Sequence, residues 1–292
     1  MSAEDQVSKL LSLTESNLSD STDIVLAPET ALPPMWEDSA LIKNRSLIAI
    51  SKIMQRYPKV RFIAGAITQR KFWKDEVITE TARRSADDSF YYDVFNSALM
   101  IDQTSGIQIS HKSILVSGVE KMPFQKYFSF LGEYVLHLGG TSGSLGAADE
   151  PVLFSGKNGM KIGPVICFES AFCEYSAKMV KRGANLLVVI TNDGLWKDSP
   201  GIWQHFGYSR LRAVETRRSI AHSANTGISG FINQRGDLLK KTVVNSEEVL
   251  HSQIRLNGEI TFFVSHGDYL GRISMILSGL ILIYLIVSRW WE

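Results

Sequence analysis

Cysteine is scarce in this sequence of 292 residues, and its scarcity excludes several architectures. The two cysteines, Cys167 and Cys173, are too few for a disulfide framework in a chain of this length. There is no CxxC pair, and no cysteine–histidine cluster has the spacing of a zinc site. We therefore expect no metal and no cofactor, and we expect each of the dispersed histidines to be a packing or surface residue.

Excess charge of either sign is also lacking, because the formal net charge is +1. Basic residues occur in short pairs such as Arg83–Arg84, which are typical of solvated surfaces, so bulk electrostatics do not indicate a nucleic-acid partner. The first 17 residues carry early acids and no apolar run, unlike a signal peptide. The hydrophobic content of 45% is ordinary for a globular protein with a sizeable core.

One long apolar run stands near the end of the chain. Residues 273–288 are uncharged, with Arg272 and Arg289 on either side and Trp290 and Trp291 following. A bilayer core needs about 20 residues of helix, and the flanking arginines and tryptophans suit its interfaces. A buried core helix is the alternative. We favour a transmembrane helix because the run has almost no polar face. The balanced arginines leave its orientation open.

Strand and helix patterns alternate along the rest of the chain, which indicates an α/β fold with one core. A charged, irregular exposed loop is expected over residues 70–90, and a flexible glycine- and serine-rich loop over 139–150. Helices are predicted over residues 7–18, 38–57, 170–182 and 203–219. Strands are predicted over residues 23–27, 60–67, 94–102, 107–112, 161–168, 186–191, 220–225, 228–234 and 259–264.

Three of the predicted strands end in reactive side chains: Glu29, Lys112 and Cys167. Glu120 and Glu169 follow closely after two of them. Functional groups of α/β proteins commonly lie where strands end at one edge of a sheet. A carboxylate can take the proton of a thiol, and an ammonium group can stabilise the thiolate and a developing oxyanion. The set is sufficient for acyl transfer without a metal or cofactor.

The local motifs resemble those of the nitrilase superfamily, and more closely those of the apolipoprotein N-acyltransferases of bacterial envelopes. The resemblance covers the chain from about residue 20, and its most specific part is TNDGLW with the block that follows it. The matching stretches are PETALP (28–33), HKSILVSGVEKMPF (111–124), ICFES (166–170), TNDGLW (191–196), residues 204–237 and the C-terminal apolar helix. The resemblance implies a four-layer αββα sandwich with a Glu–Lys–Cys triad.

The same resemblance implies a role for each site residue. Glu29 would be the general base, Lys112 the oxyanion stabiliser and Cys167 the nucleophile, with Glu120 and Glu169 as supporting glutamates. The thiol would take an acyl chain from a phospholipid and pass it to the N-terminal amine of a diacylglyceryl-cysteine lipoprotein. The implied location is the bacterial inner membrane, with the catalytic domain on the periplasmic side.

The sequence departs from the family pattern at three places. Phe168 stands where a tyrosine is common after the nucleophile, and Ser117 stands where a proline is common. Residues 1–267 would form the catalytic domain without its first strand and without the N-terminal membrane helices of the family. Residues 268–292 would form the C-terminal transmembrane helix. A missing strand would leave a sheet edge exposed.

Two other functions stay open at this point. A nitrilase-type amidase or carbamoylase would use the same triad with water as the acceptor. An inactive membrane-anchored module would bind a lipoprotein or partner without turnover. The apolar stretch 124–138 is either a lipid-facing wall or an amphipathic core segment, and Cys173 is expected to be an inert core residue.

Overall fold

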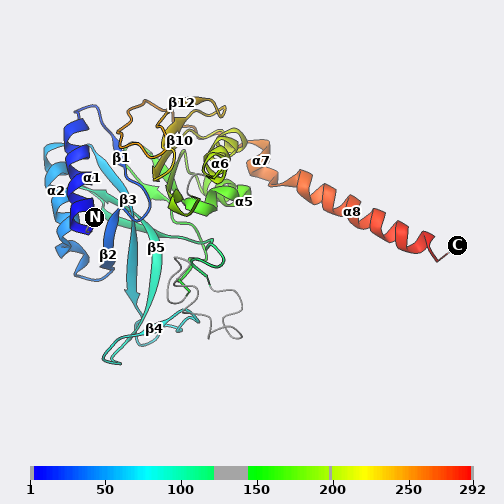
Figure 1. Ribbon diagram of the computed structural model, residues 1–292, viewed down its shortest axis with the longest axis horizontal. Coiled ribbons are helices and arrows are strands. Elements are labelled where there is room, and N and C mark those ends of the chain that lie inside the picture. Colours follow the sequence, from blue (N-terminus) through cyan, green and yellow to red (C-terminus); the bar gives the residue numbers. More distant parts are fainter. Residues whose placement is uncertain (1–2, 122–143, 197–198, 291–292) are drawn as a thin grey trace.

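The structure is a computed structural model that describes residues 3–121, 144–196 and 199–290. Two six-stranded sheets pack face to face, and helices cover the outer face of each sheet (Figure 1). The predicted α/β class and the αββα sandwich are confirmed. The stretch 124–138, for which a lipid-facing role was considered, lies outside the described residues.

The first sheet is built around two long strands that pair antiparallel, β3 and β5. β1 and β2 run parallel to β3, whereas β4 and β6 pair antiparallel with β5. β3 is buried along most of its length, as expected of a continuous apolar run in a central strand. The strands are β1 (Ile24–Leu26), β2 (Leu32–Trp36), β3 (Arg61–Lys71), β4 (Arg83–Arg84), β5 (Tyr91–Asp102) and β6 (Gly106–His111).

The second sheet has the order β12-β11-β10-β9-β8-β7. Its centre consists of three parallel strands, β8, β9 and β10, and the chain crosses between them through helices α5 and α6. The strands are β7 (Phe154–Ser155), β8 (Lys161–Ile166), β9 (Leu186–Asn192), β10 (Ile220–Asn225), β11 (Gly230–Ile232) and β12 (Leu238–Lys241).

Helices α1 (Ala3–Asn17) and α2 (Arg45–Arg56) cover the first sheet. α5 (Cys173–Lys181), α6 (Gly201–Thr216) and α7 (Phe262–His266) cover the second. The described part of the chain also has three short 3₁₀ helices: η1 (Leu41–Lys43), η3 (Cys167–Ala171) and η4 (Asp193–Trp196). The last two follow β8 and β9 directly, so they lie at the same edge of the second sheet.

The two sheets share an apolar layer between them. Ile63 and Met100 of the first sheet meet Ile162 and Val188 of the second, and all four side chains are fully buried. Neighbouring residues of β3, such as Phe62, point to the opposite face and pack under α1 and α2. Each such aliphatic or aromatic side chain contributes roughly 1.5–3 kcal/mol when fully buried. The layers therefore fix how the two sheet edges meet.

Helix α8 (Tyr269–Ser288) extends away from the sandwich (Figure 1). Its mean hydropathy is 2.2, none of its residues is buried, and it is the one helix of the described residues that is long and apolar enough to cross a membrane. Asp268 caps its first turn by accepting a hydrogen bond from the Gly271 amide. Residues 273–288 therefore project from the domain, and the buried-core alternative is wrong.

Several element predictions need correction. Residues 259–264 are not a strand: the Thr261 hydroxyl accepts a hydrogen bond from the Val264 amide and starts α7. The helix predicted over 38–57 begins later, because the side chain of Asn44 caps α2 by accepting from the amides of Ser46 and Leu47. Residues 70–90 include the short strand β4, and β2 was missed because it contains two prolines.

One edge of the first sheet is formed by β1 and β2, which pair with successive parts of β3. Among the described residues β1 pairs with β3 on one side, and no second strand pairs with its other side. The expectation that a further strand belongs at this edge stays a prediction.

Candidate active site

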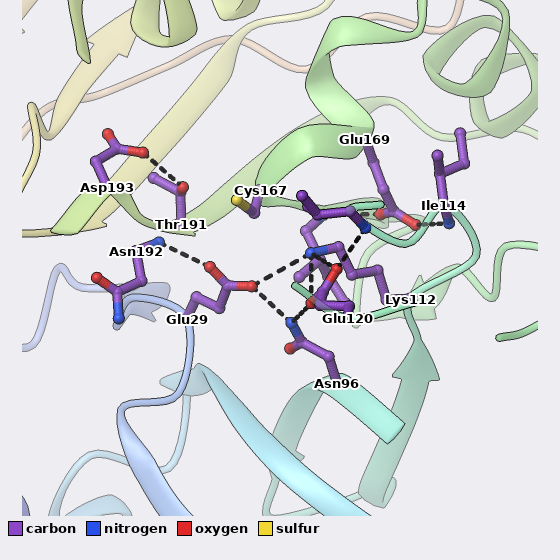
Figure 2. A network of polar contacts seen from close by, with 12 residues as sticks. Glu29, Asn96, Lys112, Ile114, Glu120, Cys167, Glu169, Thr191, Asn192 and Asp193 are labelled. Carbon is purple, nitrogen blue, oxygen red and sulfur yellow. Dashed lines mark hydrogen bonds and ion pairs between the residues drawn. The ribbon is translucent and has the colours of Figure 1, made fainter. Parts of the chain in front are cut away.

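The three predicted strand-end residues come together between the two sheets. Glu29 follows β1 and Lys112 follows β6, both in the first sheet, whereas Cys167 follows β8 in the second. Figure 2 shows the three side chains around one small region of polar contacts. Glu29 is 5% exposed and Lys112 is 1% exposed, so their charges are held away from bulk water.

Lys112 is held by two carboxylates. Its Nζ lies 2.8 Å from Oε2 and 2.9 Å from Oε1 of Glu120, and 3.5 Å from Oε1 of Glu29. Burial alone would lower the pKa of Lys112, but the charges of Glu29, Cys167 and Glu120 outweigh it and raise the pKa. The side chain is therefore a buried ammonium group at neutral pH and a source of positive charge within the site.

Asn96 of β5 joins the two carboxylates. Its side-chain Nδ2 donates to Oε1 of Glu29 at 2.6 Å and to Oε1 of Glu120 at 2.7 Å. Sequence reasoning missed this residue. The available signal was a polar side chain inside the buried run of β5, where an unpaired amide would be unfavourable.

Glu29 also connects the two sheets. Its Oε2 accepts a hydrogen bond from the backbone amide of Asn192, at the end of β9, at 2.7 Å. The backbone around it approaches β3 closely: a Cβ on Gly65 would lie 2.6 Å from Glu29 Cα and 2.6 Å from Thr30 N. Thr30 itself has a φ of 50°, in the left-handed region. The carboxylate is thus fixed by both its backbone and its side-chain contacts.

Cys167 begins η3 with a φ of 52°, which is unusual for a residue with a side chain. Figure 2 shows its sulfur directed toward the side where Glu29 and Thr191 lie. Burial and the charge of Glu29 raise the pKa of the thiol to about 12, against the opposing charge of Lys112. The thiol is therefore protonated at neutral pH and needs a base in order to react.

Glu169 links the turn at Cys167 to the loop after Lys112. It accepts hydrogen bonds from the amides of Ile166 (2.8 Å), Ser113 (2.6 Å) and Ile114 (3.2 Å). Burial raises its pKa to about 7 although these bonds favour the carboxylate. This side chain thereby couples the positions of the predicted cation and nucleophile.

Phe168 and Cys173 contact residues outside the Glu29–Lys112–Cys167 cluster. The half-buried Phe168 ring packs edge-on against Phe172, with 5.2 Å between ring centroids. Cys173 begins α5 and is only partly buried; burial is the main cause that raises its pKa, and its charged neighbours are Arg212, Glu215 and Asp268. Its surroundings are therefore different from the cluster of acids and lysine around Cys167.

A second polar group adjoins Cys167. Asp193 and His205 are buried and in contact with each other, and His205 also contacts the backbone carbonyl of Cys167. Both residues lie within motifs that carried the family resemblance, but no role was predicted for Asp193, and His205 was expected to be a packing or surface residue. Among the described residues, no group of histidine, cysteine and carboxylate side chains is arranged to hold a metal ion.

Comparison with known proteins decides the family. The model of the family described as carbon-nitrogen hydrolase matches residues 1–260. The chain belongs to the carbon-nitrogen hydrolase family. A solved member of the family, from Helicobacter pylori, superposes with a TM-score of 0.60 over 87% of this chain and 85% of its own, at 15% identity. An amidase from Nesterenkonia sp. gives 0.54 over 84% and 82%, at 13% identity. These similarities show the fold.

Curated relatives within the family are similar over most of this chain. The apolipoprotein N-acyltransferase of Chlorobaculum tepidum is 27% identical over 98% of the chain and 54% of its own length. The apolipoprotein N-acyltransferase of Geobacter metallireducens is 35% identical over 85% of the chain and 43% of its own length. The chain thus spans about half the length of these relatives.

Proposed function

We propose that this chain carries the catalytic part of an apolipoprotein N-acyltransferase. The observation that carries the proposal is the combination of a buried acid, cation and thiol with an exposed apolar helix, α8, on the same chain. A phospholipid donor resides in a bilayer, so an enzyme tethered there meets it directly. The similarity to relatives with that name, over most of this chain, supports the same function.

In the first half-reaction, Glu29 takes the proton of the Cys167 thiol while the sulfur attacks an ester carbonyl carbon of a phospholipid. A C–S bond forms, and the carbonyl oxygen gains negative charge that the Lys112 ammonium stabilises. When the tetrahedral intermediate collapses, the ester C–O bond breaks. The departing alkoxide receives the proton from Glu29 and leaves as a lysophospholipid, and Cys167 remains as a thioester.

In the second half-reaction, the N-terminal amine of a diacylglyceryl-cysteine lipoprotein attacks the thioester carbon. A C–N bond forms, the amine gives up a proton to Glu29, and the C–S bond breaks. The thiolate then regains the proton from Glu29. Atoms and charge balance over the two steps, and no metal or redox partner takes part.

The surrounding residues hold these groups in position. Glu120 fixes the Lys112 ammonium, while Asn96 donates to both Glu120 and Glu29. Glu169 ties the nucleophile turn to the loop after Lys112. With the cation held by Glu120, one carboxylate remains available for proton transfer, and we assign that role to Glu29.

The chain is assigned to the bacterial inner membrane with the catalytic domain on the periplasmic side. In this arrangement residues 1–267 are the catalytic domain. Residues 268–292 form a transmembrane anchor. The partners are then a phospholipid donor, a lipoprotein acceptor and the membrane itself.

The test is acyl transfer by the full chain in phospholipid bilayers, with a synthetic diacylglyceryl-cysteine peptide as the acceptor. We expect a third, amide-linked acyl chain on the peptide, detected by mass spectrometry, and no product with Cys167→Ala. If the chain releases ammonia from small amides and leaves the peptide unmodified, it is an amidase. If neither reaction occurs, it is a binding module, and the proposal is wrong in both cases.

A further inference from the structure

The ring of His205 lies between two hydrogen-bond acceptors. Its Nδ1 is 2.7 Å from Oδ1 of Asp193, and its Nε2 is 3.0 Å from the backbone carbonyl oxygen of Cys167. His205 is 3% exposed and Asp193 is fully buried. His205 and Asp193, which belong to α6 and η4, thus reach the backbone of the residue that we assign as nucleophile from outside the Glu29–Lys112 cluster.

The two contacts together point to a ring with a proton on each nitrogen. A neutral imidazole carries one N–H, and its second nitrogen is an acceptor. A peptide carbonyl accepts only, and so does an ionised carboxylate, so both short contacts are satisfied at once when both ring nitrogens carry protons. The Thr191 hydroxyl donates to the same Oδ1 of Asp193 at 2.9 Å, so this oxygen is in contact with two groups.

The contacted peptide is also the strained one. Cys167 has a φ of 52°, a conformation that costs on the order of 1–3 kcal/mol for a residue with a side chain. Glu169 accepts a hydrogen bond from the Ile166 amide at 2.8 Å, on the N-terminal side of Cys167, and His205 contacts the Cys167 carbonyl on its C-terminal side. The turn that aims the sulfur is therefore fixed from both sides.

We propose that His205 is an imidazolium that, paired with Asp193, acts as a positioning residue by clamping the Cys167 carbonyl and aiming the thiol at the reacting carbon. That the thiol is aimed at a reacting carbon rests on the proposed function. The charge of the His205 ring and its contact with the Cys167 carbonyl do not depend on that function. Asp193 is the counter-ion that makes a buried cation tolerable at this position.

The surroundings agree with a charged ring. Burial alone would lower the pKa of His205, but the hydrogen bond and charge of Asp193, with help from the Cys167 carbonyl and Glu29, raise it. The clamp is therefore complete below the ordinary histidine pKa and is lost as the pH rises through the raised one. The groups that face the ring are Asp193, Cys167, Glu29, Tyr208 and His222.

His222 provides an internal control. It lies in β10 next to His205, with 6.2 Å between ring centroids, and its Nδ1 contacts the Ser209 hydroxyl at 2.8 Å. Burial and the neighbouring charge of His205 lower the pKa of His222 to about 3. One chain thus contains two adjacent buried histidines that we expect in opposite protonation states at neutral pH.

The direct test is nitrogen NMR of the full chain with labelled histidine, in detergent at neutral pH. We expect two protonated ring nitrogens for His205 and one for His222. A single protonated nitrogen on His205 would overturn the proposal, and this measurement does not depend on whether a variant folds.

A kinetic test measures positioning without any lipid. Iodoacetamide alkylation of Cys167 is followed against pH in His205→Gln and His222→Gln, each compared with the unsubstituted chain. We expect His205→Gln to slow alkylation roughly 10- to 100-fold at low pH, with the difference shrinking as the pH rises through the raised pKa of His205. The ratio of the alkylation rate of His222→Gln to that of the unsubstituted chain should not change with pH.

If the alkylation rate of His205→Gln relative to the unsubstituted chain is constant with pH, the proposal that His205 clamps the Cys167 carbonyl is wrong. Neither of these readouts involves phospholipid. A charged His205 with no acyl transfer would therefore sink the proposed function alone, and acyl transfer with a neutral His205 would sink the clamp alone.

Discussion

The ammonium nitrogen of Lys112 lies 2.8 Å from Oε2 of Glu120 but 3.5 Å from Oε1 of Glu29. The two carboxylates therefore differ in how strongly they hold the same cation. Glu120 accepts from Lys112, Asn96 and the Val116 amide, so its lone pairs are largely engaged. Glu29 has the looser contact, which suits a group that must exchange a proton with a substrate.

Removing the charge of Glu29 should make the Cys167 thiol more acidic and yet slow its acylation. The charge of Glu29 raises the pKa of the Cys167 thiol, so Glu29→Gln should lower this pKa from about 12. The charge of Lys112 lowers the same pKa, so Lys112→Met should raise it. Acyl-enzyme formation should nevertheless fall in both, on the order of 10²–10⁴ for the lost base and 10²–10³ for the lost cation. The pH profile of alkylation, in a Cys173→Ser background, measures the pKa.

The opposite signs of the two pKa shifts are the critical result. An unchanged thiol pKa in Glu29→Gln, or full acylation by that variant, would show that Glu29 is not the base. Cys173→Ser serves as a background because Cys173 lies outside the cluster and its neighbours are Arg212, Glu215 and Asp268.

Gly65 should be required for the position of Glu29. In Gly65→Ala the new methyl group would lie 2.6 Å from Glu29 Cα, so the backbone must shift and carry the carboxylate with it. We expect acylation to fall by up to about 10²-fold and stability by about 1–3 kcal/mol. Denaturant unfolding and single-turnover acylation of the same samples measure the two effects.

Gly207→Ala is the matched control for this prediction. A Cβ at Gly207, within α6, would meet no atom within 4 Å, and alanine favours a helix over glycine by roughly 0.5–1 kcal/mol. This variant should therefore be at least as stable as the unsubstituted chain. Equal losses in the two variants would refute the steric explanation.

The sequence could predict the fold class and the three strand-end residues, because these depend on local patterns. Apolar runs mark the strands, and a reactive side chain directly after a buried strand lies at a sheet edge wherever the strand pairs. The meeting of Glu29 and Lys112 with Cys167 could be anticipated from family motifs, but not from spacing, since it depends on how the two sheets stack.

The remaining contacts depend on register and three-dimensional packing. Asn96 reaches both glutamates because it pairs with Ile67 of β3, while its backbone carbonyl accepts a hydrogen bond from the Lys112 amide after β6. His205 reaches Cys167 because α6 packs against η3, far away in sequence. The strand predicted over residues 259–264 was wrong for a related reason: a single side-chain cap at Thr261 outweighed the local pattern.

Helix α8 should determine membrane association. A charged residue at its centre should oppose insertion, so Leu282→Arg should weaken insertion by about 2.5–3.5 kcal/mol. Flotation with phospholipid vesicles measures the bound fraction. The control is Leu239→Arg, on the exposed strand β12 of the sandwich, which should float like the unsubstituted chain. Equal flotation of all three would show that α8 is not the anchor.

The central claim is that Cys167 carries an acyl thioester, and intact-protein mass spectrometry with peptide mapping tests it most directly. The full chain is incubated with phospholipid, without an acceptor, and digested at a pH that preserves thioesters. We predict one acyl adduct, on the peptide that contains Cys167, retained in Cys173→Ser and absent in Cys167→Ser. An adduct on Cys173, or one that survives Cys167→Ser, would contradict the account.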